Sequence, residues 1–285
     1  MPQRAKSTGK GVTMFEMVGI TDTGRMRAEN EDAIGVHADV GVAILADGMG
    51  GHAAGEVASR IAIDMISRHV AEVFMRDMER KKKGQIPEAA MEVNAVYDAV
   101  NLANNAIYEM ARARPECAGM GSTVVIAIFY DDKICVGHVG DSRLYRYRGG
   151  ELTQLTEDHS VVQELVSRGL LTLEEAHATV GKNLVTRALG VDTSVEPDVD
   201  EKTAEEADIY LLCSDGLNDM LSDDDIRKLL AEQGADLDAA AKRLVAEANE
   251  RGGADNISVI LVRANNGFVR EKKAVKELQS RLKPA

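Results

Sequence analysis

The chain has 285 residues, of which 45% are apolar and 28% are charged, the balance of an ordinary soluble globular protein. It carries 47 acidic and 34 basic residues, a net charge of −13, so we expect no nucleic-acid partner, whose affinity would depend on lysines and arginines set against phosphates. An acidic surface is also repelled by an anionic membrane face. A protein partner, or a substrate approached through bound cations, fits this charge better.

The sequence contains no membrane-spanning or secretory signal. Its longest apolar run, Val124 to Tyr130, is too short to span a bilayer, and residues 1–11 lack the apolar stretch of a signal peptide. Cys117, Cys135 and Cys213 share no metal-binding spacing, and we expect buried, reduced thiols. These features predict a cytoplasmic protein without membrane insertion.

The first part of the chain alternates between strands and long helices. Strand-like runs cover 14–21, 33–37 and 42–46, and apolar residues three and four positions apart predict helices over 55–80 and 88–113. The stretch Lys81-Lys82-Lys83-Gly84 is typical of a helix end, because basic side chains offset the helix dipole and glycine closes the last turn.

The remaining elements follow a similar alternation. Strands are predicted over 122–130, 133–140, 143–147 and 151–155, with a hairpin turn at Gly149-Gly150. A mixed segment follows over 159–190, with a short helix over 161–168. Two further strands, 208–214 and 256–263, bracket helices over 223–232 and 236–251, and a last helix covers 268–282. We expect one domain in which antiparallel sheet layers are flanked by helix layers.

Five aspartates fall at the ends of predicted strands: Asp32, Asp47, Asp141, Asp215 and Asp255. A single aspartate at such a place is usually a turn or helix cap, but five carboxylates at one sheet edge would repel each other unless cations neutralised them. No histidine or cysteine cluster accompanies them, so the implied ions are Mg²⁺ or Mn²⁺ rather than zinc. Two such ions can share a water, lower its pKa and clamp a phosphoryl group.

Six motifs in order carry a resemblance to a known family. They are Arg27-Ala-Glu-Asn-Glu-Asp32, Asp47-Gly48-Met-Gly-Gly, Gly121-Ser-Thr, Gly140-Asp141-Ser-Arg, Ser214-Asp215-Gly-Leu and Ala254-Asp255-Asn-Ile. With them the chain resembles the metal-dependent type 2C (PPM family) protein phosphatases, and more narrowly the bacterial Ser/Thr branch, from about Phe15 to Arg263. The resemblance implies an α+β fold, a four-layer αββα sandwich whose two central antiparallel β-sheets are flanked by helix pairs, with a dinuclear site at one end.

The same resemblance assigns roles to the ligands of two Mn²⁺ or Mg²⁺ ions. Asp47 would bridge both ions, the carbonyl of Gly48 would complete one, and Asp215 and Asp255 would hold the other. Asp32, with Glu31 beside it, would bind the second ion directly or through water.

Two further positions match family residues. Asp141 matches the acid that, with Asp215, holds a third, weaker ion in bacterial relatives. Arg27 matches the phosphate-binding arginine, whose planar guanidinium suits two phosphate oxygens.

The chain departs from the family at two places. Animal members carry a histidine two residues after the bridging aspartate as the proposed general acid, but Met49 stands there, and His52 nearby is either a proton donor or a structural or solvated side chain. The segment after Asp158 resembles the family's flap, yet His177 is followed by alanine where bacterial relatives usually have proline. Substrate preference is therefore the property of the family that we least expect this chain to share.

We therefore expect a flexible tail over 1–13, a catalytic domain over 14–264 with a flap at about 159–190, and a C-terminal helical extension over 265–285 that either docks on the body or binds a partner. The expected activity is hydrolysis of phosphoserine and phosphothreonine on proteins by direct attack of a metal-bridging water, in a monomer that opposes a bacterial Ser/Thr kinase. The alternatives are a phosphatase of an anti-anti-sigma-type regulator, a metallo-phosphodiesterase and a non-catalytic phosphoprotein-binding module.

Overall fold

Two antiparallel sheets form the centre of the molecule. The computed structural model describes residues 15–51, 54–86, 90–180, 184–264 and 270–282. The first sheet runs, from edge to edge, through β1 (Phe15–Asp22), β11 (Ile257–Ala264), β10 (Ile209–Cys213), β7 (Arg143–Arg148) and β8 (Glu151–Gln154). The second runs through β2 (Asp32–His37), β3 (Val42–Met49), β5 (Val124–Tyr130), β6 (Lys133–Val139) and β9 (Asp198–Thr203), and the short β4 (Gly121–Ser122) pairs with β3.

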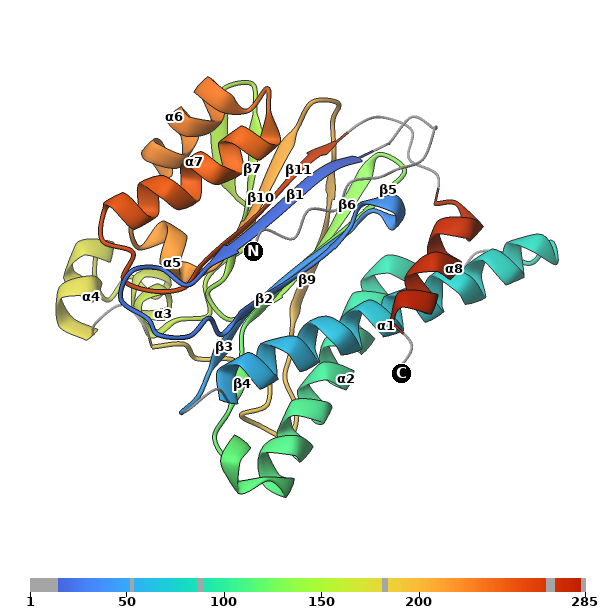
Figure 1. Ribbon diagram of the computed structural model, residues 1–285, viewed down its shortest axis with the longest axis horizontal. Coiled ribbons are helices and arrows are strands. Elements are labelled where there is room, and N and C mark those ends of the chain that lie inside the picture. Colours follow the sequence, from blue (N-terminus) through green and yellow to red (C-terminus); the bar gives the residue numbers. More distant parts are fainter. Residues whose placement is uncertain (1–14, 52–53, 87–89, 181–183, 265–269, 283–285) are drawn as a thin grey trace.

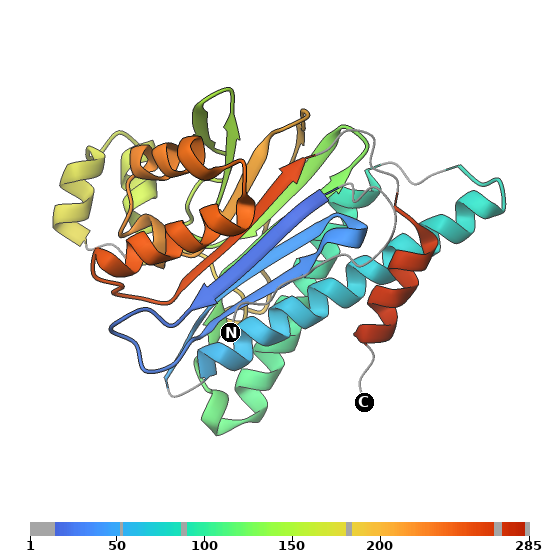
Figure 2. The same ribbon diagram turned by 45° about the horizontal axis from the view of Figure 1, so that its top comes forward.

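Helices cover the outer face of each sheet (Figures 1 and 2). On the second sheet these are α1 (Ala54–Lys82), α2 (Met91–Ala113) and α8 (Lys272–Arg281); on the first they are α6 (Asp223–Gln233) and α7 (Leu237–Glu250). At one end lie α3 (Val161–Ser167), α4 (Leu173–Val180) and α5 (Asp215–Asn218), and the 3₁₀ turns Ala38–Val40 and Pro115–Cys117 complete the elements. The expected four-layer αββα sandwich is confirmed.

The apolar runs of the central strands account for the layering. In β3, Ile44 and Ala46 pack toward the helices, whereas Ala43 and Leu45 pack between the sheets. Successive side chains of a strand point to opposite faces, and a strand buried on both faces is therefore apolar throughout. β10 and β11 follow the same rule, so one core lies between the sheets and one lies under each helix layer.

The C-terminal helix packs on the body of the protein. Val275 and Leu278 of α8 are buried in the core of the second sheet's helix layer, and α8 packs against α1 and the turn Ala38–Val40. Arg270, just before α8, forms an ion pair with Glu92 at 2.9 Å and stacks over the Phe74 ring at 3.7 Å. Of the two interpretations of this segment, docking on the body is the one observed. The expected helix pair over the second sheet is α1 and α2, and α8 adds to this layer by packing against α1.

Several boundaries differ from the sequence-based expectations. β3 does not end before Asp47 but runs to Met49, since Asp32 and Ser122 continue the pairing opposite Asp47 and Gly48. The predicted strand 122–130 is divided at Thr123, where the chain changes from β4 to β5. The sequence did not predict β9, a polar and largely exposed edge strand, nor α4 and α5. The predicted tail 1–13 and His52 lie outside the described residues.

Other expectations are met. The hairpin forms at Gly149-Gly150 between β7 and β8, and α1 ends at the lysine run. All three cysteines are buried and free. None of the helices in the described part of the chain is both long and apolar enough to cross a membrane.

We expect Arg270→Ala to lower the free energy of unfolding by about 3 kcal/mol, because removing one partner of a buried ion pair leaves Glu92 uncompensated. Urea denaturation of the full chain measures this. Lys273→Ala, at an exposed position of α8, is the control and should change stability by less than about 0.5 kcal/mol. Equal effects of the two substitutions would contradict the anchoring role of Arg270.

Candidate metal centre

Two aspartates of the second sheet lie directly opposite each other. Asp32 is the first residue of β2, and its partner in the β2–β3 register is Asp47. The Asp47 backbone is fixed on its other side by Thr123, whose N–H donates to Asp47 O at 2.8 Å and whose hydroxyl accepts from Asp47 N at 3.2 Å. The two carboxylates are therefore held at the same end of the sheet.

Two more aspartates come from the first sheet. Asp215 begins α5 directly after β10, and Asp255 lies two residues before β11, so neighbouring antiparallel strands bring them to one edge. Ser214 Oγ accepts from Ser258 N at 3.0 Å and donates to Asp32 Oδ2 at 2.8 Å. This serine joins the ends of the two sheets, which places the four carboxylates in one cluster.

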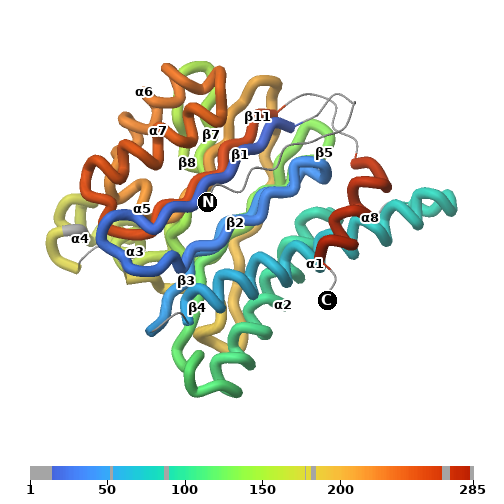
Figure 3. Tube along the Cα trace, viewed as in Figure 1, coloured from blue at the N-terminus to red at the C-terminus, as the bar shows by residue number. Residues whose placement is uncertain are grey.

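Asp141 follows β6 and is buried at the margin of this cluster. Its neighbour Ser142 hydrogen-bonds through Oγ to Thr123 Oγ1 at 2.8 Å, which ties the Asp141 turn to the residue that fixes Asp47. A cavity of about 50 Å³ is lined by Asp141 and Asp215 together. All five predicted aspartates thus meet at one end of the sandwich, where the β1–β2 loop and α5 also lie (Figure 3).

The carboxylate cluster carries an excess of negative charge. Burial, followed by the carboxylates of Asp32 and Asp215, raises the pKa of Asp47 well above its ordinary value. The pKa of Asp215 is raised in the same way, by burial and then by Asp141 and Asp255. Burial also raises the pKa of Asp32, and it raises that of Asp141 to about 6. Each carboxylate disfavours the ionisation of its neighbours.

The donor set fits hard divalent cations. Asp32 Oδ1 and Asp215 Oδ1 are buried and have no hydrogen-bond partner among the described residues. A buried carboxylate oxygen without a partner is costly unless a cation or solvent satisfies it. Since all the convergent groups offer oxygen, they suit Mg²⁺ or Mn²⁺ and not a softer metal.

Gly48 permits a close approach that no other residue allows. A Cβ at this position would lie 2.0 Å from the Gly55 carbonyl oxygen and 2.6 Å from the Glu31 carbonyl oxygen. The N-terminus of α1 therefore packs directly on the strand that carries Asp47. Glu31 Oε1 accepts from Gly55 N at 3.1 Å, so in this structure the Glu31 side chain binds the helix N-terminus.

Arg27 lies at the rim of the cluster. Its side chain is 49% exposed, and Nη2 donates to Asp255 Oδ2 at 2.7 Å. The loop that carries it is held by Asn256, whose Oδ1 accepts from Glu31 N at 2.9 Å and whose Nδ2 donates to the carbonyls of Thr23 and Glu29. An exposed guanidinium next to the carboxylates is well placed to bind an anion that the cations also attract.

Sequence reasoning assigned no role to the small polar residues that position the acids. Ser214, Asn256, Thr123 and Ser142 appeared only as letters within motifs, yet their hydrogen bonds connect the loops of this site. The available signal was their adjacency, since each stands directly beside an aspartate or opposite one in the sheet. Met49, at the end of β3, has no ionisable group and supplies no acid at its position.

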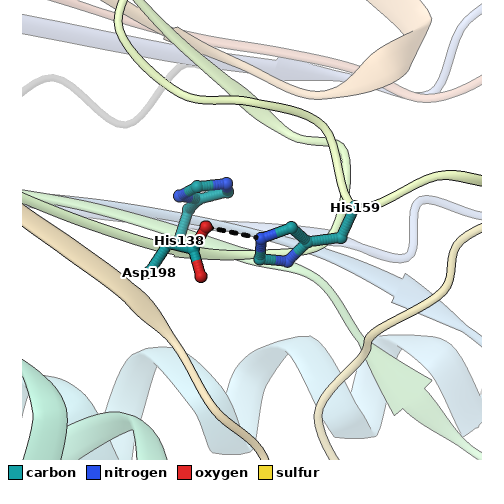
Figure 4. Close-up of side chains that lie close together, drawn as sticks. All are labelled: His138, His159 and Asp198. Carbon is teal, nitrogen blue, oxygen red and sulfur yellow. Dashed lines mark ion pairs between the residues drawn. The ribbon is translucent and has the colours of Figure 1, made fainter. Parts of the chain in front are cut away.

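The sequence did not predict a second cluster, of two histidines and an aspartate, next to the Asp141 turn. His138 and His159 stack with ring centroids 4.4 Å apart, and Asp198 lies beside them (Figure 4). His138 is three residues before Asp141, but His159 and Asp198 are distant in sequence and their spacing gave no sign of the contact.

Comparison with known proteins gives a consistent result. A family model described as protein phosphatase 2C matches residues 25–253. The serine/threonine protein phosphatase PstP of Mycobacterium tuberculosis is 40% identical over 241 residues, which are 85% of this chain and 43% of that protein. The serine/threonine phosphatase stp of Listeria welshimeri is 36% identical over 86% of this chain and 94% of its own length. The chain thus spans less than half of the mycobacterial relative and nearly all of the Listeria one.

Solved structures agree in fold. The crystal structure of Mycobacterium tuberculosis PstP has a TM-score of 0.76 and 37% identity, covering 88% of this chain and 99% of that one. The catalytic domain of PstP in complex with two manganese ions has a TM-score of 0.74 at 37% identity and the same coverage.

In metal-free protein at pH 7.5, we expect Asp47→Asn to raise the Tm by about 2–4 °C, the shift that about 1 kcal/mol gives a chain of this size. The raised pKa of Asp47 means that its ionised form destabilises the fold, so its contribution to stability is present at acidic pH and lost as the pH rises through that pKa. Thermal unfolding in the presence of a chelator measures the difference, which should disappear near pH 4.

The control is Asp224→Asn, because Asp224 is paired with Lys228 on the exposed side of α6 and should give no rise in Tm. A lower Tm for metal-free Asp47→Asn than for the unaltered protein would contradict the repulsion described above.

Proposed function

The chain belongs to the protein phosphatase 2C family, and we propose that it is a metal-dependent protein phosphatase that hydrolyses phosphoserine and phosphothreonine on proteins. The observation that carries the proposal is the convergence of five aspartates from both sheets at one end of the sandwich. Neither sheet supplies the whole set, so the site depends on the complete fold.

We propose that Asp47 bridges two divalent cations, with the Gly48 carbonyl on one of them and Asp215 and Asp255 on the other. Asp32 would bind the second cation directly or through water, and Asp141 would join Asp215 in holding a third, weaker one. Bound at these oxygens, such ions supply an activated water and neutralise the phosphoryl oxygens during in-line attack. The partnerless oxygens of Asp32 and Asp215 support this assignment.

Arg27 is proposed to bind the phosphoryl group of the substrate. Its guanidinium lies at the rim of the cluster and is half exposed. When substrate binds, the guanidinium would leave Asp255 and bind the phosphate oxygens. Its planar fork orients the phosphate through two parallel hydrogen bonds. Since Met49 cannot donate a proton, the leaving serine or threonine oxygen takes its proton from another group.

The boundaries and setting belong to the same proposal. We place the catalytic domain at 14–264, with a flap at about 159–190, a tail at 1–13 and a helical extension at 265–285. Packing of α8 against α1 supports treating the extension as part of the same folded unit. We also propose that the protein acts as a monomer in the cytoplasm and opposes a Ser/Thr protein kinase, since a hydrolase for phosphoproteins requires an enzyme that makes them.

Phosphate release from a phosphothreonine peptide tests the function. We expect release that requires Mn²⁺, that stops when the metal is chelated, and that falls by at least about a hundredfold in Asp47→Asn and Asp215→Asn, because losing a ligand costs more than the 10–100-fold typical of an outer partner. Asp224→Asn should retain activity. Hydrolysis of bis(p-nitrophenyl) phosphate in preference to the peptide would contradict the proposal, as would unchanged activity in either ligand variant.

For Arg27→Ala we expect KM for the phosphopeptide to rise about tenfold with a smaller change in kcat, because a charged hydrogen bond contributes about 1.5–3 kcal/mol. Steady-state kinetics at saturating Mn²⁺ separate the two constants. Arg25→Ala, two residues earlier at an exposed position, is the matched control. An unchanged KM in Arg27→Ala would remove the phosphate-binding role.

A further inference from the structure

His138, His159 and Asp198 form a cluster next to the turn that carries Asp141, and this cluster takes no part in the function proposed above (Figure 4). His138 belongs to β6, His159 begins the segment that leads into α3, and Asp198 begins β9. Both histidine side chains are buried, whereas Asp198 is half exposed. One potential ligand atom from each of the three residues lies within 4.8 Å of those of the other two, a spacing that raises the question of a bound metal ion.

The hydrogen bonding of the His159 ring argues against a metal ion there. Gly140 N donates to His159 Nδ1 at 3.2 Å, so Nδ1 carries a lone pair and the ring proton resides on Nε2. His159 Nε2 lies 3.3 Å from Asp198 Oδ2, a charge contact that does not have hydrogen-bond geometry. Burial lowers the pKa of both histidines and so disfavours their charged forms. A metal ion at His159 Nε2 would have to displace the proton that the Gly140 hydrogen bond to Nδ1 places there.

His159 holds both polar backbone groups of Gly140. Its own N–H donates to Gly140 O at 3.0 Å, while its Nδ1 accepts from Gly140 N. Gly140 has φ +102°, a conformation that favours glycine, and a Cβ there would lie 2.6 Å from Thr123 Cγ2. The next residue is Asp141, so the orientation of this carboxylate follows from how the Gly140 peptide is held.

His159 also closes the base of the segment between residues 160 and 184. Its carbonyl accepts from Thr186 N at 2.8 Å, and Val161 N donates to Leu184 O at 2.9 Å, so the chain that leaves His159 returns to it. On the far side, Asp198 Oδ1 accepts from Arg187 Nη1 at 2.8 Å. The imidazole therefore stands between the Asp141 turn and the returning end of the proposed flap.

We propose that His159 is a positioning residue, which fixes Asp141 for a divalent cation through Gly140 and connects that cation site to the base of the flap through Asp198 and Arg187. This inference rests on the proposed function, since it takes Asp141 as a ligand. In this proposal His159 contacts neither the substrate nor the metal.

The His159 side chain has two connections, one to Gly140 N and one to Asp198, and three substitutions separate them. His159→Ala removes both side-chain connections. His159→Asn keeps an acceptor oxygen where Nδ1 stands, facing Gly140 N, but cannot reach Asp198. His159→Gln keeps a donor toward Asp198 but has no acceptor beside Gly140.

Calorimetric titration of the metal-free full chain with Mn²⁺ tests the proposal without any activity measurement. We expect His159→Ala and His159→Gln to weaken about tenfold the binding step that Asp141→Asn also weakens, a loss typical of an outer partner of a metal ligand. His159→Asn should restore most of that affinity. If His159→Ala does not fold, the comparison of Gln with Asn gives the same test.

The matched control is His37→Asn, at a partly buried histidine in β2 that hydrogen-bonds Ser67 Oγ of α1 at 2.9 Å. It should lower the Tm without changing Mn²⁺ affinity, which separates positioning from general loss of stability.

Three results would overturn the proposal. If Asp141→Asn weakens Mn²⁺ binding but His159→Ala and His159→Gln do not, the positioning role alone fails. If Asp141→Asn changes no binding step, the assignment of Asp141 as a ligand fails and the positioning role with it. If the protein binds Zn²⁺ at a site that His138→Ala abolishes, the histidine cluster is a metal site instead.

Discussion

Mutual repulsion among buried carboxylates is the constraint on which this structure depends. Asp32 and Asp47 face each other across one sheet, and Asp215 and Asp255 reach the same point from the other. The raised pKa values of Asp32, Asp47 and Asp215 indicate that the fold holds negative charge where burial disfavours it and no basic side chain is paired with these three carboxylates among the described residues. Natural proteins keep such a cluster only when cations offset its cost. In the metal-free molecule this end of the sandwich therefore carries unfavourable charge repulsion, which bound divalent ions would offset.

The rest of the fold serves to hold these oxygens in place. Apolar strands buried on both faces fix where each strand ends, and the acids occupy those ends. Small residues then set the final geometry: Ser214 joins the two sheets, Gly48 admits the backbone of α1, and Asn256 pins the loop that carries Arg27. In the proposal above, His159 has a similar positioning role, because it connects the Asp141 turn to the base of the flap.

The sequence predicted the parts of the molecule that local chemistry determines. The apolar runs of β3, β10 and β11, the end of α1 at its lysines and the positions of the five aspartates followed from pattern and spacing, and the resemblance to a family added the sandwich. β9 was missed because an exposed edge strand that is polar on both faces carries no alternation signal. Asp47 was placed after its strand because an apolar run ends there, although backbone pairing with Asp32 and Ser122 continues the ladder. The stacking of His138 on His159 depends on tertiary contacts, which no spacing along the chain records.

Anomalous diffraction from crystals grown with Mn²⁺, recorded at the manganese absorption edge, tests the central claim most directly. The account predicts two strong peaks among the carboxylates of Asp47, Asp215 and Asp255, with both ions within reach of Asp47. The absence of density among these side chains, or manganese bound instead by His138 and His159, would contradict it.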